Sequence, residues 1–326
     1  MSALYVTEQG AVLRRTGERL LVTREEKLLN DVPIIHVEQV VIVGNIQITT
    51  PAVALLLQKE VDVVFLSRYG KYRGRLMTTG SKFAELRHRQ LCLMEDGRQI
   101  LALARELVVA KLAGQAALLE RLGAGQPAAG RVKEAARRAR RAASVESLRG
   151  YEGSGGAAYF DGFRELVPSG WGFIKRIYHP PTDRINAMLS LGYTLLLKDV
   201  TTAVQLVGLD PYLGVFHALD YGRPSLCLDL MEPFRPVVDD LVLGLVAGGR
   251  IAREAFEKRK KDGAVLLVNE ARKRYLRAYE DRMARRTAYP RGGEETTIRR
   301  CLEVQARRWA RVVLGKAKTF PAFVAG

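Results

Sequence analysis

LRGYEGSGGAAYF, residues 148–160, places the acidic side chain of Glu152 among four glycines: Gly150, Gly153, Gly155 and Gly156. Glycine lets the backbone adopt positive φ or approach another group closely, so this run predicts a backbone that holds the carboxylate in a fixed place. The helix-prone run AAYFDGFREL follows it. Because one carboxylate does not make an active site, other segments must supply its partners.

Two other interpretations of these glycines are disfavoured by their spacing. A phosphate-binding loop would show GxxxxGK[ST] after a strand, and GSGG has neither feature. Ser154 lacks the GxSxG context that would expose a nucleophilic hydroxyl at a strand-to-helix turn. The sequence therefore favours neither a nucleotide-dependent enzyme nor a serine nucleophile.

The composition is typical of a globular protein of the cell interior. The 326 residues are enough for two domains, and 48% of them are hydrophobic. No secretory signal is visible, and no uncharged apolar run reaches the length of a membrane span. The three cysteines, Cys92, Cys227 and Cys301, are scattered and form no CxxC pair, which suits a reducing compartment. We expect a cytoplasmic protein without a membrane partner.

The formal net charge of +17 is the strongest global signal, and it is unevenly distributed. Residues 250–318 contain 21 Lys or Arg against 9 Asp or Glu. A second cluster, RVKEAARRARR, spans residues 131–141 and includes Arg137 and Arg138. Such an excess indicates a polyanionic partner, most often nucleic acid. A solvated basic surface without a partner is the alternative.

The chain is predicted to be α+β, with a small N-terminal β-sandwich-like domain in residues 1–76. Short strands alternate there with turn signals, around one helix in ITTPAVALLLQKE with Thr50 as its N-cap. His36 is expected inside a strand, as a structural residue. Residues 67–80 are predicted to connect the domains, either touching DNA or remaining solvated.

Residues 77–326 are predicted to form a larger, all-helical domain, because apolar residues recur at helical spacing from Ser81 onward. The pattern predicts a break near Asp96 and Gly97, a loop at 123–130, an Arg-rich helix at 131–149 and a loop at 167–183. Asp183 is a suitable N-cap for a long helix that ends at Gly208. The final residues, PAFVAG, are expected to fray.

A set of metal-binding residue types follows Glu152 in the chain. Asp229 and Glu232 are three apart in SLCLDLMEPF, a spacing that places both carboxylates on one face of a helix. His217 lies among apolar neighbours in YLGVFHALD. One imidazole and two carboxylates suit Mn²⁺ and tolerate Mg²⁺. Each residue alone has a simpler explanation, since His217 could be a core histidine and the acids could pair with Arg235 at the surface.

Four segments read in order carry a resemblance: LRGYEGSGGAAYF, PPTDRINAMLSLGYTLL, GLDPYLGVFH and PSLCLDLMEPFRPVVD. Together they resemble the CRISPR-associated adaptation integrase, a metal-dependent DNA endonuclease. The resemblance implies an N-terminal β domain that serves dimerisation, an all-α catalytic domain and a homodimer. It also implies assembly with a small second CRISPR-associated protein. The expected activity joins the 3′-hydroxyl ends of captured duplex DNA into the CRISPR repeat array by transesterification.

The resemblance also assigns roles to residues. It implies that Glu152, His217 and Glu232 bind Mg²⁺ or Mn²⁺ and that Asp229 tunes the catalytic site or contacts the ion through water. Pro233 departs from the family pattern, which often has a second acid there, and could shift the start of the helix.

Asn186 and Tyr193 match a further family pattern, DxxNxxLSxGY. Asn186 is expected to orient a neighbouring loop. Tyr193 is expected near the site, and Lys111, Arg223 and Arg235 are candidate phosphate contacts, with surface salt bridges as the alternative. The competing functional hypothesis is a catalytically inactive, dimeric DNA-binding scaffold.

Overall fold

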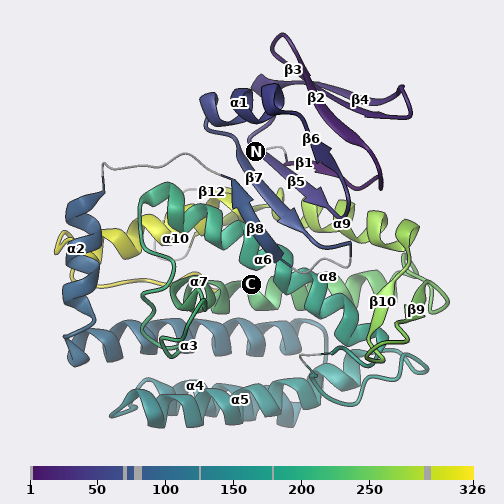
Figure 1. The fold of residues 1–326 in the computed structure, drawn as a ribbon. Helices are drawn as coiled ribbons and strands as arrows, with labels where there is room; N and C mark the ends of the chain where they lie inside the picture. The colour runs from purple at the N-terminus through teal and green to yellow at the C-terminus, as the bar shows by residue number, and fades with distance from the viewer. Residues whose placement is uncertain (1–2, 69–71, 77–82, 125, 178–179, 290–294) are drawn as a thin grey trace. The chain divides into compact units, whose positions relative to one another are not determined.

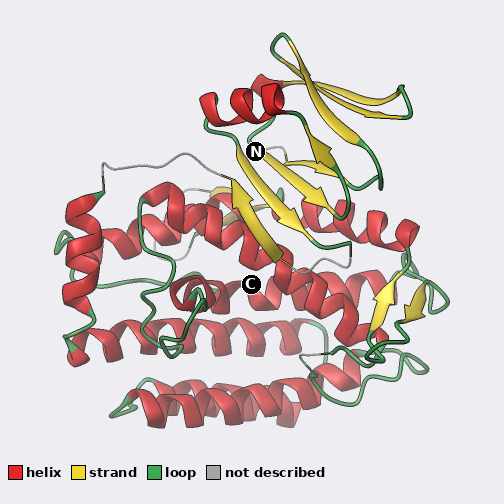
Figure 2. Ribbon diagram, viewed as in Figure 1, coloured by secondary structure: helices red, strands yellow, loops and turns green. Residues whose placement is uncertain are grey.

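The computed structural model describes residues 3–68, 72–76, 83–124, 126–177, 180–289 and 295–326. The chain divides into two compact units, residues 1–81 and 82–326. Strands dominate the first unit and helices the second (Figures 1 and 2), which confirms the predicted α+β class. No helix among the described residues is long and apolar enough to cross a bilayer.

The described residues of the N-terminal unit form two four-stranded sheets. The first has the order β1-β5-β7-β8, formed by β1 (Ala3–Val6), β5 (Gln39–Val43), β7 (Asp62–Leu66) and β8 (Tyr72–Leu76). The second has the order β4-β3-β2-β6, formed by β4 (Lys27–Pro33), β3 (Arg19–Arg24), β2 (Val12–Thr16) and β6 (Gln47–Ile48). Apolar residues of both sheets and of helix α1 (Thr50–Gln58) share one core. The predicted sandwich-like architecture is therefore confirmed.

Three local predictions in this unit need correction. The N-cap of α1 is Thr49, one residue earlier than predicted, because Thr50 already has helical geometry. His36 lies in the 3₁₀ turn η1 (Ile34–His36) and not in a strand. Part of the predicted connection at 67–80 is strand β8, which pairs with β7. Residues 69–71 and 77–80 of that segment lie outside the described residues.

The C-terminal unit is built from helices, whose bounds are α2 (Ala84–Leu93), α3 (Gly97–Arg121), α4 (Gln126–Ala139), α5 (Val145–Leu166), α6 (Arg184–Val207), α7 (Ser225–Met231), η2 (Glu232–Phe234), α8 (Arg235–Ala247), α9 (Asn269–Met283) and α10 (Ile298–Val313). In the part of this unit that the structure describes, two short antiparallel strand pairs interrupt the helices, β9 (Phe256–Lys258) with β10 (Val265–Leu267) and β11 (Arg286–Ala288) with β12 (Glu295–Thr297). The prediction of an all-helical second domain is corrected by these strand pairs, whose three-residue strands are too short to show an alternating pattern.

Capping residues explain where the helices begin and end. Asp96 accepts hydrogen bonds from the backbone N–H groups of the first turn of α3, which confirms the predicted break. Asp183 caps α6 in the same way, and Gly208, with φ of 92°, ends that helix. Ser144 and Ser147 form a reciprocal cap at the start of α5.

The segment around Glu152 differs from its prediction, because the glycine-rich run is the middle of helix α5. A Cβ built on Gly155 would lie 2.6 Å from Leu112 Cδ2 of α3, so glycine is required here for close helix packing. The predicted loop at 123–130 contains the first turn of α4, and the predicted 131–149 helix is divided at residues 140–144. Helices α3, α4 and α5 consequently form one packed layer (Figure 1).

The C-terminal segment packs against the helices, which corrects the prediction that it frays. Phe320 and Phe323 are each 2% exposed. The Phe323 ring stacks on Phe234 of η2, with centroids 4.2 Å apart and planes 1° from parallel. The Phe323 backbone N–H donates to Gln305 Oε1, and Gln305 Nε2 donates to the Leu230 carbonyl. The chain end therefore supports the turn that carries Glu232.

Candidate functional site

Three helical elements bring Glu152, Glu232 and Lys111 together. Glu152 comes from α5, Glu232 is the first residue of η2, and Lys111 comes from α3, which packs against both. The Lys111 ammonium pairs with Glu152 Oε1 and lies 2.5 Å from Glu232 Oε2. Arg235 Nε donates to Glu232 Oε1 at 2.7 Å. Glu152 and Glu232, which are 80 positions apart in the sequence, thus share the buried ammonium of Lys111.

Asp229 fixes the position and orientation of His217. Its side chain is fully buried, and Oδ2 accepts from the backbone N–H groups of Val215 at 2.6 Å and Phe216 at 3.0 Å. Oδ1 lies 2.9 Å from the His217 backbone N and 2.7 Å from its Nδ1. When Nδ1 donates to Asp229, Nε2 carries the free lone pair. Nε2 lies 3.9 Å from Glu232 Oε1. Asp229 is therefore a positioning residue, with no oxygen left to face the cluster.

The charges of the cluster stabilise one another. Burial opposes ionisation of Glu232, but the positive charges of Arg235 and Lys111 outweigh it and lower its pKa to about 2. Burial likewise opposes protonation of Lys111, but the charges of Glu232 and Glu152 outweigh it and raise the Lys111 pKa. At neutral pH Glu232 is consequently ionised and Lys111 protonated.

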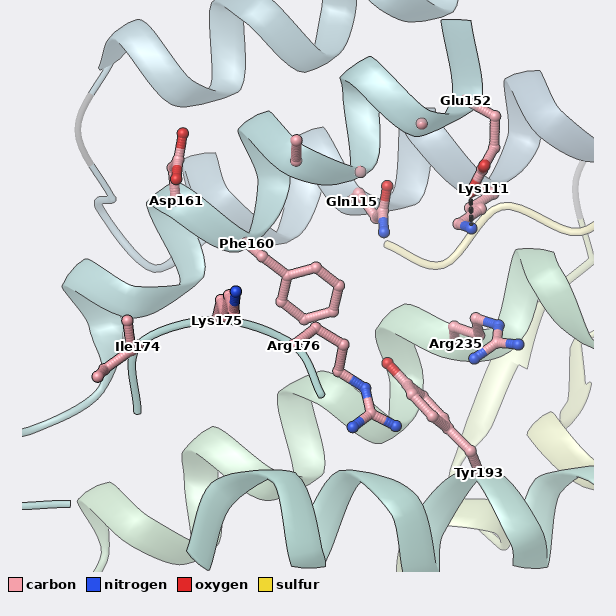
Figure 3. A pocket seen from close by; sticks show the side chains of 13 residues that line it. Lys111, Gln115, Glu152, Phe160, Asp161, Ile174, Lys175, Arg176, Tyr193 and Arg235 are labelled. Carbon is pink, nitrogen blue, oxygen red and sulfur yellow. Dashed lines mark hydrogen bonds and ion pairs between the residues drawn. The ribbon is translucent and has the colours of Figure 1, made fainter. Parts of the chain in front are cut away.

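A cavity of about 350 Å³ opens beside this cluster (Figure 3). Its walls combine the Lys111–Glu152 pair with aromatic and basic side chains, and they include Gln115, Phe160, Asp161, Lys175, Arg176, Tyr193 and Arg235. The guanidinium carbons of Arg176 and Arg235 lie 5.3 Å and 4.6 Å from the centroid of the Tyr193 ring. Such a wall offers positive charge and flat apolar faces to a polyanion.

Asn186 orients the loop that carries two of these basic residues. Its Oδ1 accepts from Arg176 Nη1 at 2.7 Å and from the Ile177 backbone N–H at 2.9 Å, and its Nδ2 donates to the Lys175 carbonyl at 2.9 Å. The residue is fully buried near the start of α6. This confirms the predicted structural role of Asn186.

Tyr193 lines the cavity, as expected for a residue near the site, but its hydroxyl faces inward. It donates to Asp239 Oδ1 at 2.5 Å, and the Tyr159 hydroxyl donates to Asp239 Oδ2 at 2.7 Å. Burial raises the pKa of Asp239 to about 6, although both tyrosine hydrogen bonds act against that increase. The Tyr193 hydroxyl is therefore engaged by Asp239, while the ring lies beside Arg176 and Arg235.

The donor set fits a divalent cation, although the described residues form no closed group of three ligating side chains. Two carboxylates and one imidazole with a free Nε2 are suitable ligands, and a carboxylate behind the imidazole is the usual outer support of a metal site. Glu232 Oε2 is buried and has no hydrogen bond of regular geometry, although the Lys111 ammonium lies beside it. Glu152, His217 and Glu232 would hold the ion. Pro233 is the second residue of the 3₁₀ turn η2, and Glu232 remains in the cluster.

The predicted DNA contacts fall in different surroundings. Lys111 is 8% exposed and occupied by two carboxylates, so in this state it is unavailable to a phosphate. Arg235 pairs with Glu232 but also reaches the cavity. Arg137 and Arg138 lie at the exposed end of α4, and both pair with Glu134. Arg223 is half-buried in the loop before α7, and it does not line the described cavity.

Sequence reasoning missed Arg176 and Asp239, and it left open whether Lys111 contacts a phosphate or forms the salt bridges that the structure shows. Asp239 carried a weak signal, because it is an acid in the apolar run PVVDDLVLGLV. Arg176 lies in a loop without periodicity, and the partner of Lys111 is 41 residues away. No local pattern could have revealed either contact.

A protein-family model and a curated relative both match most of this chain. The family model described as CRISPR associated protein Cas1 matches residues 4–281. A CRISPR-associated endonuclease Cas1 of Thermus thermophilus is 38% identical over 326 residues, covering 99% of this chain and 97% of that protein.

Two solved structures share the fold. A casposase bound to its integration product has a TM-score of 0.86 at 22% identity, with 98% of this chain and 93% of that chain covered. A chain of a Cas6-RT-Cas1–Cas2 complex has a TM-score of 0.83 at 23% identity, and the match covers all of this chain and 36% of that one. The family model and the identity to the Thermus protein, both over most of the chain, show that this protein belongs to the CRISPR-associated protein Cas1 family.

Proposed function

We propose that this protein is a metal-dependent DNA endonuclease and integrase of CRISPR adaptation. The observation that carries the proposal is the convergence of Glu152, Glu232 and an Asp229-oriented His217 beside a cavity with basic and aromatic walls. The Thermus relative is named an endonuclease, and the casposase of the same fold was solved with an integration product. Both names agree with phosphodiester chemistry at this site.

The expected reaction is a transesterification. The 3′-hydroxyl oxygen of the incoming DNA would form a bond to the target phosphorus, the bond from that phosphorus to its own 3′-oxygen would break, and the released 3′-oxygen would take up a proton. Mg²⁺ or Mn²⁺, when bound, would supply Lewis-acid polarisation of the phosphodiester. Glu152, Glu232 and His217 would supply the ligands, and Asp229 would hold His217 with Nε2 toward them. Arg176 and Arg235 would stabilise the negative charge of the phosphate, because they are hydrogen-bond donors held in place beside the reacting group. With water as the nucleophile, the same site would cut DNA.

The proposed partners follow from charge and from the relatives. The +17 net charge favours duplex DNA, held largely through phosphates. A chain of the same fold belongs to a Cas6-RT-Cas1–Cas2 complex, which supports Cas2 as the small second protein. The resemblance to the family implies that the present chain acts as a homodimer. If about six to ten phosphates are neutralised, affinity should fall roughly 10³–10⁵-fold between 50 and 200 mM salt.

The test is strand transfer of a labelled short duplex into a supercoiled plasmid that carries a CRISPR repeat, with Cas2 present. We expect joining that requires Mg²⁺ or Mn²⁺ and is lost in Glu152→Ala. Glu146→Ala is the matched control, because Glu146 is an exposed acid of the first turn of the same helix. Joining that survives Glu152→Ala would reject the ligand assignment. Duplex binding without joining by the native protein would favour the inactive scaffold.

A further inference from the structure

The ammonium of Lys111 lies where the proposed metal ion has to bind. It contacts Glu152 Oε1 and is 2.5 Å from Glu232 Oε2, so it takes one oxygen from each of the two acidic ligands. Divalent cations of this class bind carboxylate oxygens at roughly 2.0–2.6 Å. An ion that bridged the same two oxygens would lie almost where the ammonium lies, and the two positive charges would repel each other. Binding of the ion therefore requires Lys111 to move.

The surroundings provide a place for the displaced ammonium. Lys111 and Gln115 both line the cavity, and they are four residues apart on α3, so their side chains lie on the same face of the helix. Gln115 Oε1 is buried and has no hydrogen-bond partner in the described structure. A buried acceptor without a partner is costly, and an ammonium from the adjacent turn would satisfy it.

We propose that Lys111 is a built-in counter-ion of the metal-free site, which a divalent cation displaces toward Gln115 and the cavity. This inference rests on the proposed function. Without metal, the ammonium holds Glu152 and Glu232 together and prevents their repulsion. With metal bound, the same ammonium faces the cavity, where a DNA phosphate can accept its charge. Lys111 would then contact DNA only in the metal-bound state.

The first test is the affinity for Mn²⁺, measured by calorimetry, together with the melting temperature in EDTA. For Lys111→Met we expect a lower melting temperature without metal but a Mn²⁺ Kd at least about tenfold smaller, because a competing positive charge is gone. For Gln115→Leu we expect a larger Mn²⁺ Kd, because the displaced ammonium loses the acceptor that it would move to. Lys133→Met is the matched control, because Lys133 is an exposed lysine of the same helical layer that pairs with Glu120.

The outcomes separate this inference from the proposed function. A native protein that binds Mn²⁺, combined with an unchanged or larger Kd for Lys111→Met, would overturn the counter-ion role and leave the metal site intact. Absence of Mn²⁺ binding in both proteins would reject the metal site and this inference together.

A second measurement uses the native protein, in case Lys111→Met does not fold. Reductive methylation with mass spectrometry reports how reactive each lysine is. We expect Mg²⁺ to raise the modification rate of Lys111 several-fold, because the ammonium leaves its two carboxylates, while the rate of exposed Lys133 stays constant. An unchanged or lower Lys111 rate in saturating Mg²⁺ would contradict displacement.

Discussion

Replacing Asp229 with asparagine tests whether the site depends on one buried carboxylate. Asp229 Oδ2 accepts from two backbone N–H groups, and Oδ1 faces the His217 backbone N–H and the His217 ring. An asparagine keeps one oxygen and turns the other into an NH₂ donor. In one orientation this donor faces two backbone N–H groups. In the other it faces His217, which must then carry its proton on Nε2.

The magnitude follows from the hydrogen bonds that the substitution breaks. Either orientation leaves about two buried donors without an acceptor, at roughly 1–3 kcal/mol each. A central value of about 4 kcal/mol corresponds to a decrease in melting temperature of roughly 8–16 °C for a unit of this size. Metal affinity should fall about 10- to 100-fold, because an outer carboxylate that supports a ligating histidine has been removed.

The assay combines differential scanning calorimetry without metal and Mn²⁺ titration at neutral pH. Asp220→Asn is the matched control, since Asp220 is an exposed acid of the same loop and should show little change in either measurement. A variant at position 229 that keeps both the native melting temperature and the native Mn²⁺ affinity would refute the reasoning. It would mean that the loop positions His217 without this carboxylate.

Three further predictions concern the scaffold around the site. Burial raises the pKa of Asp239 from 3.8 to about 6, so this carboxyl keeps its proton in the folded protein at pH values where it is ionised in the unfolded chain. Its contribution to stability therefore falls by about 3 kcal/mol as pH rises from about 4 to 6. The melting temperature of the native protein minus that of Asp239→Asn should fall over this range, and a constant difference would contradict the shift. Gly155→Ala should destabilise the protein by about 1–3 kcal/mol through overpacking. Gly150→Ala has open space around its Cβ and should stabilise the protein by about 0.5–1 kcal/mol, as measured by urea unfolding. Phe323→Ala should lower the free energy of unfolding by about 3–5 kcal/mol. It should also weaken Mn²⁺ binding, because the Phe323 ring supports η2. A destabilised variant that binds Mn²⁺ with the native affinity would rule out that support.

Much of the fold was predictable, because its signals are local. Asp96, Asp183 and Gly208 were identified as helix ends from residue type and position, and each has the corresponding geometry. The short strand pairs near residues 256–267 and 286–297 gave no such signal, since a three-residue strand shows no period. The packed chain end was missed for a related reason: Phe323 is buried by distant helices and not by its own neighbours.

The site was predictable as a set of residue types, but its geometry was not. Glu152, His217 and Glu232 could be selected from four ordered motifs, and the structure brings the two acids together through Lys111. The orienting role of Asp229 depends on hydrogen bonds with loop residues that lie 12 to 14 positions earlier in the sequence. Pairing across such separations is decided by tertiary packing, which leaves no trace in spacing.

The glycines around Glu152 show how a correct residue can be reached through an incorrect mechanism. A glycine-rich run predicts a special backbone, and none of these glycines has positive φ. Instead, Gly155 and Gly162 are seven apart on the same side of α5, and a Cβ on either would meet α3 or α4 at 3.0 Å or less. Removing side chains from that face lets α5 approach α3 closely enough for Glu152 to reach Lys111. The glycines therefore act on the carboxylate through helix packing, which makes the separation of α3 and α5 the property that determines the site.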